Sequence, residues 1–245
     1  MRRALRIGAW TLGSVLTVLV ALVAAVLIAG NTAAGRALIE RSIARFSDGH
    51  VRLSGLAGSF PAAIDLEQLQ LSDERGVWLS AARVSLRWSP LALLARHVDL
   101  ERLHISRLDI ERRPVSQASV QSKASLPRID ISQLSIETLE LGPQLAGVRA
   151  TLSVQGSAHL LSLEHATATL NAHRTNGAGD YQIRLSSDPS RVDASLTLEE
   201  PAGGALANLL KVPGLGALSV TATLVGPRNA ERLQLTARAV LLRAP

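Results

Sequence analysis

The sequence predicts a mainly β protein, an elongated and strongly twisted sheet that forms an open groove behind an N-terminal transmembrane helix. Two observations predict this fold: a five-residue cadence of aliphatic residues and an uncharged segment near the start of the chain. A third is the composition, which is 47% hydrophobic but only 2% aromatic. Aromatic side chains dominate most compact cores, so their scarcity favours an extended body with an aliphatic surface. A GC-rich gene, which would favour Ala and Arg, explains the same composition equally well.

The cadence is clearest in Val98–Ile110, where aliphatic residues come in i, i+2 pairs separated by gaps of two residues. It returns in Ile129–Leu141 and, in a shorter form, in Ile64–Leu71. The copies begin 34 and 31 residues apart, a spacing typical of repeat architectures. The paired residues are the candidates to line the groove: Ile64, Leu66, Leu69, Leu71, Val98, Leu100, Leu103, Ile105, Leu108, Ile110, Ile129, Ile131, Leu134, Ile136, Leu139 and Leu141.

A period of five fits neither a regular helix nor a regular strand. Residues i and i+2 share one face of a strand, but a two-residue gap would send the next pair to the opposite face. A β-bulge at each gap restores the phase, because two residues then oppose one on the neighbouring strand. We therefore expect long bulged strands with one apolar face. Ordinary short strands with irregular alternation remain the alternative, whereas a pentapeptide β-helix would need more consecutive units than three.

Residues 1–32 are expected to form a cytoplasmic tail and a membrane anchor. Ile7–Gly30 carries no charge over 24 residues, and a helix of that length reaches about 36 Å, enough to cross a hydrocarbon core of about 30 Å. Arg2, Arg3 and Arg6 precede it and favour a cytoplasmic N-terminus. We therefore expect a single-pass protein of the bacterial inner membrane with its bulk in the periplasm. Cleavage near Thr32–Gly35 is the alternative.

Residues 33–49 should form a short amphipathic helix, over residues 34–46, with Ile39, Ile43 and Phe46 on one side. It either caps the first strands or lies on the membrane surface, and capping is favoured because so short a stripe binds lipid weakly.

Residues 50–245 should form a β-rich groove region, with short helices at 90–95 and 203–211 and a mobile loop at 114–127. Because the chain stops within the strand pattern, we expect this region to be truncated at its C-terminal end. The expected strands are Val51–Leu56, Ile64–Leu71, Val77–Trp88, Val98–Ile110, Ile129–Leu141, Val148–Gln155, Leu160–Ala172, Asp180–Ser186, Arg191–Leu198, Leu218–Val225 and Leu233–Val240.

No motif in the sequence predicts catalysis, a cofactor or a metal. The six histidines show no metal-ligand spacing, and Gly214-Leu215-Gly216 lacks the rest of a dinucleotide fingerprint. There is no cysteine, so thiolate sites and disulfides are excluded. The net charge is +6, and about half of it precedes the anchor, which is a poor footprint for nucleic acid. We expect a protein that is not an enzyme and has no nucleic-acid partner.

Several short motifs, together with the anchor and the cadence, resemble one known family. They are Gly55-x-x-Gly58-Ser59-Phe60, the run from Leu66 through Asp73 to Gly76-Val77-Trp78-Leu79, and Trp88-x-Pro90-Leu91-x-Leu93-Leu94. Over residues 1–115 this order closely resembles the amino-terminal part of the TamB family, within the AsmA-like group. TamB proteins are the inner-membrane subunit of the translocation and assembly module.

The resemblance implies a β-taco-like fold, a long sheet curled into a trough with an apolar inner surface. It also implies a role in outer-membrane protein assembly and secretion, and in phospholipid transport between the membranes. The implied partners are phospholipid, the inner membrane and, in full-length members, the outer-membrane subunit TamA. The family's terminal TamA-binding domain has no counterpart here, so docking to TamA is not carried over to this chain alone.

The sequence therefore leaves two alternative functions open. The first is a membrane-anchored groove protein that transports lipid and assists envelope assembly. The second is a structural tether whose sheet closes into an ordinary packed core and only positions a partner.

Overall fold

The computed structural model describes residues 28, 30–115, 128–162, 164–201, 215–227 and 230–241. Most of the expected tail and anchor lies outside the described residues, which include only residues 28 and 30–32 of it. The helix at 203–211 and most of the loop at 114–127 also lie outside them. No helix within the described ranges combines the length and the apolar character needed to cross a bilayer.

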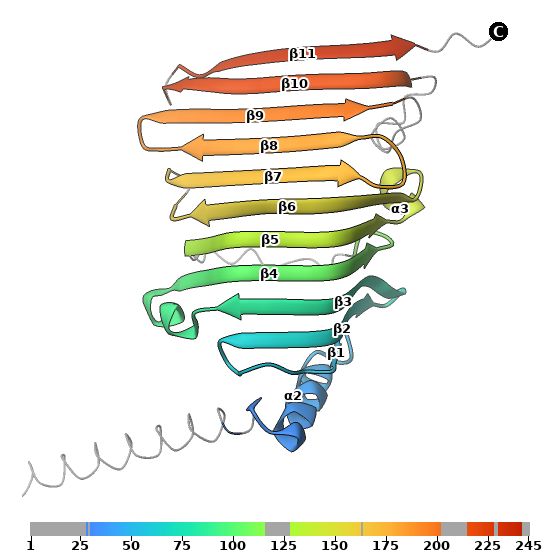
Figure 1. Ribbon diagram of the computed structural model, residues 1–245, viewed down its shortest axis with the longest axis vertical. Coiled ribbons are helices and arrows are strands. Elements are labelled where there is room, and N and C mark those ends of the chain that lie inside the picture. Colours follow the sequence, from blue (N-terminus) through green and yellow to red (C-terminus); the bar gives the residue numbers. More distant parts are fainter. Residues whose placement is uncertain are drawn as a thin grey trace, which may run out of the picture.

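The described chain is mainly β and forms one open sheet of eleven strands (Figure 1). The strands lie in the order of the sequence, from β1 at one edge to β11 at the other. The elements are α2 (Ala33–Phe46), β1 (Val51–Ser54), β2 (Ala63–Asp73), β3 (Gly76–Trp88), the 3₁₀ helix η1 (Pro90–Ala95), β4 (His97–Ile110), β5 (Arg128–Leu141), α3 (Pro143–Ala146), β6 (Ala150–Leu160), β7 (Ala166–Arg174), β8 (Asp180–Ser187), β9 (Arg191–Glu200), β10 (Leu215–Pro227) and β11 (Arg232–Leu241).

Neighbouring strands are antiparallel except for β4 and β5, which are parallel. These two strands carry the two full copies of the cadence, and each residue of one copy lies opposite its equivalent in the other, Val98 opposite Ile129 and Ile110 opposite Leu141. Residues 111–127 connect them, and a parallel pair needs a long connection of this kind. The spacing of 31 residues is thus the offset between two strands that lie side by side.

The start of this connection is fastened to the hairpin between β2 and β3. Arg112 donates to the Asp73 carboxylate with an Nη1–Oδ2 distance of 2.7 Å, and the backbone N–H of Val115 donates to the same oxygen at 2.9 Å. Both side chains are nearly buried, with 12% and 13% of their surface exposed. The donated bonds, above all those from Arg112, hold the pKa of the Asp73 carboxyl well below its usual range.

The α2 helix lies beside β1 at the first edge of the sheet (Figure 1). The backbone N–H of Leu56 donates to the Glu40 carboxylate over 2.7 Å, which ties the chain after β1 to the helix. Ile39 and Ile43 are half-buried, whereas Phe46, which belongs to the predicted apolar stripe, is 89% exposed. The helix therefore lies at the position expected for a cap on the first strands, although none of its side chains is fully buried.

Two features of the sequence were interpreted incorrectly. The predicted strand Leu160–Ala172 is interrupted, because the backbone N–H of Leu161 donates to the carbonyl of His165 at 3.0 Å and closes a turn between β6 and β7. The short helix α3 was not predicted. Its signals are Pro143 in the first turn and Gly147, whose φ of +72° ends the helix in a left-handed conformation.

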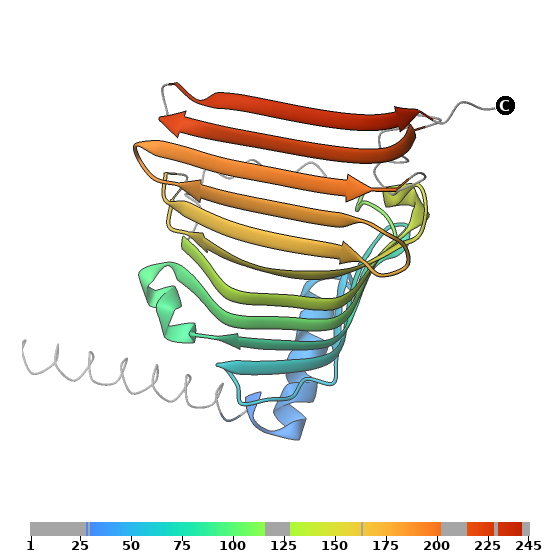
Figure 2. The same cartoon turned by 45° about the horizontal axis from the view of Figure 1, so that its top comes forward.

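Figure 2 shows the strands bowed along their length, but the sheet is open and not curled, so the described residues do not form the trough that the family resemblance implies. The most buried cluster lies where α3 meets β5 and β6, and it consists of Ile136, Ala146, Ala150, Leu152 and Val154. Ala150 has no exposed surface, and Ala146 of α3 is 4% exposed. The core is therefore small and lies near one end of these strands.

Candidate functional site

The register of β5 against β6 places the whole second copy of the cadence on one face. Strand β6 alternates regularly, so Ala150, Leu152, Val154, Gly156, Ala158 and Leu160 share a face. Their partners in β5 are, in the same order, Leu141, Leu139, Ile136, Leu134, Ile131 and Ile129. Because directly opposed residues point to the same side of a sheet, all six aliphatic residues of β5 share that face.

The predicted bulges are confirmed in β5. Ser132 and Gln133 together oppose Ser157, and Glu137 and Thr138 together oppose Ser153. A third register shift of this kind lies between β3 and β4, where Glu101 is the extra residue.

At other gaps the prediction of a β-bulge is wrong, because both paired strands have two residues between their apolar positions. Between Leu66 and Leu69 of β2, the facing strand β3 also has two residues between its apolar positions Ala81 and Val84. Arg83, inside that interval, has a φ of +49°. The strands therefore stay in register through a shared irregularity.

The same face receives the remaining candidates. The residues of β4 pair with their equivalents in β5, so they lie on the same face. Val84 of β3 is opposite Ile105 of β4 and also opposite Leu66 of β2, so the apolar residues of β2 and β3 lie on this face as well. All sixteen candidate residues thus lie on one face of the sheet, which we call the apolar face.

The apolar face continues over β6–β11, beyond the residues that the cadence singled out. One row crosses ten strands through Ile64, Leu86, Leu103, Leu134, Gly156, Leu170, Ile183, Leu196, Ala222 and Leu235. The sequence signal for the added residues is plain two-residue alternation, which was used to predict the strands but not the site.

Little of the described chain covers this face. The helices lie at its margins, with α2 beside β1, η1 next to the end of β3 and α3 at the ends of β5 and β6 (Figures 1 and 2). Ile183 remains 42% exposed and Leu235 63% exposed. Among the described residues no large side chain is fully buried, as expected for one layer of sheet.

One end of the apolar face carries polar groups. Tyr181 in β8 and Glu200 at the end of β9 share this face with Leu198, and the Tyr181 hydroxyl donates to the Glu200 carboxylate. Glu200 is only 4% exposed. Burial, and next the hydrogen bond to Glu200, raise the pKa of the Tyr181 phenol.

The opposite face, called the polar face below, carries charged and hydrogen-bonding side chains. Arg107 bridges two strands here, with a contact of 3.2 Å to Asp109 and another to Glu140. His104 lies 3.4 Å from Glu137. The sheet therefore sorts its side chains almost completely, aliphatic on one side and polar on the other.

A serine, a histidine and an aspartate lie side by side on the polar face, in the order found in hydrolases. His173 Nδ1 is 2.6 Å from Asp180 Oδ1, and Ser153 is opposite His173 on β6. No hydrogen bond joins Ser153 to His173 in the described structure, and the His173 and Asp180 side chains are 60% and 68% exposed. This arrangement has neither the activated nucleophile nor the shielded surroundings that acyl transfer needs. No group of His, Asp and Glu residues in the described ranges is arranged to hold a metal ion.

No protein-family model, curated protein or solved structure matches this chain.

Proposed function

We propose that this chain is an inner-membrane-anchored periplasmic protein of the TamB type that carries phospholipid acyl chains along its apolar face. In this proposal it acts in lipid transport between the membranes and in outer-membrane protein assembly and secretion. The observation that supports it is the apolar face itself, an aliphatic surface across eleven strands that no second layer of described residues covers. Its sixteen candidate residues are half-buried or buried among their neighbours, and Ile183 and Leu235 are exposed. Exposed apolar surface on this scale marks a binding surface for protein, membrane or ligand.

The chemistry of the face suits acyl chains. Moving an acyl chain through water costs about 0.8 kcal/mol per CH₂, on the order of 12 kcal/mol for sixteen carbons. An aliphatic row removes most of that cost without specific recognition, and the rows run across the strands, along the longest axis of the sheet (Figure 1). Curling of the sheet around the chains would complete the trough that the family resemblance implies.

Photocrosslinking tests this proposal in the intact membrane. A photoreactive amino acid replaces Leu134 or Leu103 on the apolar face, and Ser135 or His104 on the polar face serves as the matched position. We expect crosslinks to phospholipid from the two leucine positions and not from their neighbours. Crosslinks from both faces, or from neither, would contradict the proposal. Crosslinks from the apolar face to protein alone would favour the structural tether.

A charge on the apolar face should block loading. We expect Leu134→Glu to reduce lipid crosslinking at position 103 several-fold, because an ionised carboxylate is costly to place among acyl chains. Gln133→Glu is the control, since its side chain is on the polar face, where Gln133 already accepts a hydrogen bond from Arg102. If Leu134→Glu fails to fold, Leu235→Glu repeats the test at a side chain that is 63% exposed. Unchanged crosslinking in a folded variant would count against the proposal.

A further inference from the structure

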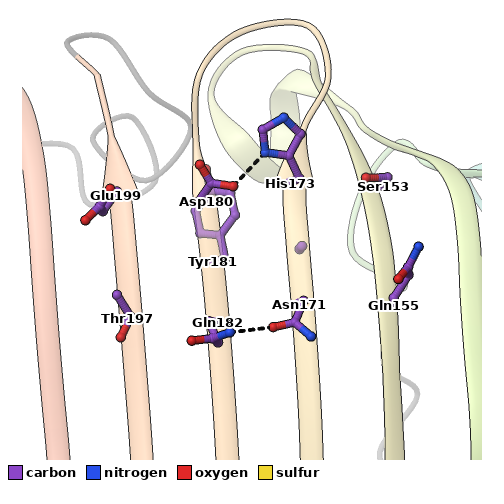
Figure 3. A pocket seen from close by; sticks show the side chains of 10 residues that line it. Ser153, Gln155, Asn171, His173, Asp180, Tyr181, Gln182, Thr197 and Glu199 are labelled. Atoms are coloured by element: carbon purple, nitrogen blue, oxygen red, sulfur yellow. Dashed lines mark hydrogen bonds and ion pairs between the residues drawn. The ribbon is translucent and has the colours of Figure 1, made fainter.

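The polar face of β6–β9 contains a hollow of about 470 Å³ (Figure 3). Gln155, Asn171, Gln182 and Thr197 cross it in one row, each from a different strand. A second row beside it carries Ser153, His173, Asp180 and Glu199. A volume of this size is in the range of small-molecule sites.

Much of the hydrogen-bonding capacity in this hollow is unused. Gln182 Nε2 donates to Asn171 Oδ1 over 2.8 Å, and His173 pairs with Asp180. Within the described chain, the side chains of Ser153, Gln155, Thr197 and Glu199 make no hydrogen bond to protein. Amides and hydroxyls both donate and accept, so the row can match a ligand that does the same.

The charges of the residues that line the hollow restrict the class of ligand further. The whole chain carries a net charge of +6, yet the charged groups that line the hollow are the carboxylates of Asp180 and Glu199. Phosphate, sulfate and acidic glycans would meet these carboxylates without a lysine or arginine among the lining residues. Neutral hydroxyl groups, in contrast, donate well to carboxylates.

The hollow is extended along the same strands by a second one of about 400 Å³. Its polar lining residues include Ser157, Thr169 and Ser195, which follow the first row along β6, β7 and β9, and Arg184 and Asp193 of opposite charge. Most of its surface is apolar, and Ala168, Leu185, Ala194 and Val225 also line it. A ligand that fills both hollows is therefore elongated and uncharged, and it offers apolar C–H surface to the second hollow as well as hydroxyl groups to the first.

We propose that the polar face of β6–β9 binds a neutral saccharide chain, whose hydroxyls hydrogen-bond to Gln155, Asn171, Gln182, Thr197 and Glu199. The site is on the opposite side of the sheet from the apolar face, so it works independently of the lipid proposal. No aromatic ring lines the hollow apart from Tyr181, which is directed to the other face. Without a ring for stacking, binding is weak, with a Kd of about 1 mM, which corresponds to about −4 kcal/mol.

Saturation-transfer NMR with the full chain tests the site. The chain is held in a detergent without sugar groups, and the probes are a neutral N-acetylglucosamine hexamer and a sulfated oligosaccharide of similar length. We expect saturable transfer to the neutral hexamer and little or none to the sulfated probe. Absence of transfer to the hexamer, or equal transfer to both probes, would overturn the proposal.

Three variants locate the binding. Gln182→Ala should weaken hexamer binding at least about fivefold. The reason is that the substitution removes more than one hydrogen bond to the ligand, and each contributes about 1 kcal/mol or less. Thr197→Val, which keeps the shape of the side chain, should weaken it by a smaller factor. Gln234→Ala in β11 removes the same chemistry from the same face outside both hollows and should leave binding unchanged. An equal loss in Gln234→Ala would overturn the assignment, and lipid crosslinking at position 134 should be unaffected by all three variants.

Discussion

Tyr181 reports on the polar end of the apolar face, because it is the only tyrosine in the chain. Its hydroxyl donates to Glu200, and its ring lies on the apolar face, opposite Leu198 of β9. Ionising this phenol would place a second negative charge next to a carboxylate that is 4% exposed. The neutral form is therefore strongly favoured in the folded protein.

We expect the absorbance of the phenolate to appear only well above pH 10, the ordinary midpoint for tyrosine. Because the folded pKa is raised above the unfolded one, the stability from this group is complete below pH 10 and is lost as the pH rises further. The melting temperature should fall over the same interval. Ultraviolet titration of the folded protein measures the ionisation directly.

Glu200→Gln serves as the control for this titration, because it removes the charge but retains an oxygen that accepts the hydrogen bond. Burial remains, so the midpoint should move only part of the way back toward 10. Ionisation near pH 10 in the unaltered chain would show that Tyr181 is neither buried nor bonded as described.

Strand β5 shows how an irregular sequence pattern produces a regular surface. Its two bulges against β6 absorb the gaps between aliphatic pairs, so that Ile131 and Leu134 stay on one face although they are three residues apart. A strand without the extra residue would send the preceding pair to the polar face.

Deletion of Ser132 tests the bulge. We expect the deletion to lower the free energy of unfolding by about 2 kcal/mol or more, because either Ile129 and Ile131 leave the apolar face or the hydrogen bonds to β6 are lost. Ser132→Thr, at the same exposed position, should change it by no more than about 0.5 kcal/mol. Denaturant unfolding of both variants measures the difference. Equal stability of the deletion and the substitution would mean that the extra residue does not set the register.

The existence of most strands and their apolar faces could be predicted from the sequence, but the order of the strands in the sheet and their orientation could not. The cadence of Val98–Ile110 has the same spacing when it is reversed, so it fits a parallel neighbour and an antiparallel one equally well. The turn at 161–165 contains neither glycine nor proline and was missed for that reason. The polar hollow depends on residues from four strands that alternate like any solvated face, and only the register brings them together.

As a whole, the molecule is two antiparallel runs of strands, β1–β4 and β5–β11, joined at one parallel seam. The hydrogen bonds within each run connect strands that are close in sequence. The seam joins residues 31 positions apart along its whole length, whereas the separation within an antiparallel pair shortens toward the segment that connects its two strands. The connection across the seam starts at the Asp73–Arg112 pair. Because parallel pairing is slightly less stable per residue than antiparallel pairing, we expect the sheet to divide into two cooperative units at the seam.

Native-state hydrogen exchange should reveal these two units. We expect the amides of β6–β9 to exchange together in one opening, and those of β2 and β3 in another with a different free energy. Asp73→Asn should accelerate exchange in β2 and β3 and leave β6–β9 unchanged, whereas Asp193→Asn, at an exposed pair with Arg191, is the matched control that should alter neither. A single opening shared by all the strands would contradict the division.

The direction of the hydrogen bonds has a mechanical consequence. In a sheet they run perpendicular to the strands, and here that is the longest axis of the molecule (Figure 1). If β1 and β11 were pulled apart, every pair of neighbouring strands would carry the same force, and the pairs would separate one after another. A body built this way yields to stretching along its length at low force, yet it resists shear along each strand, where many bonds must break together.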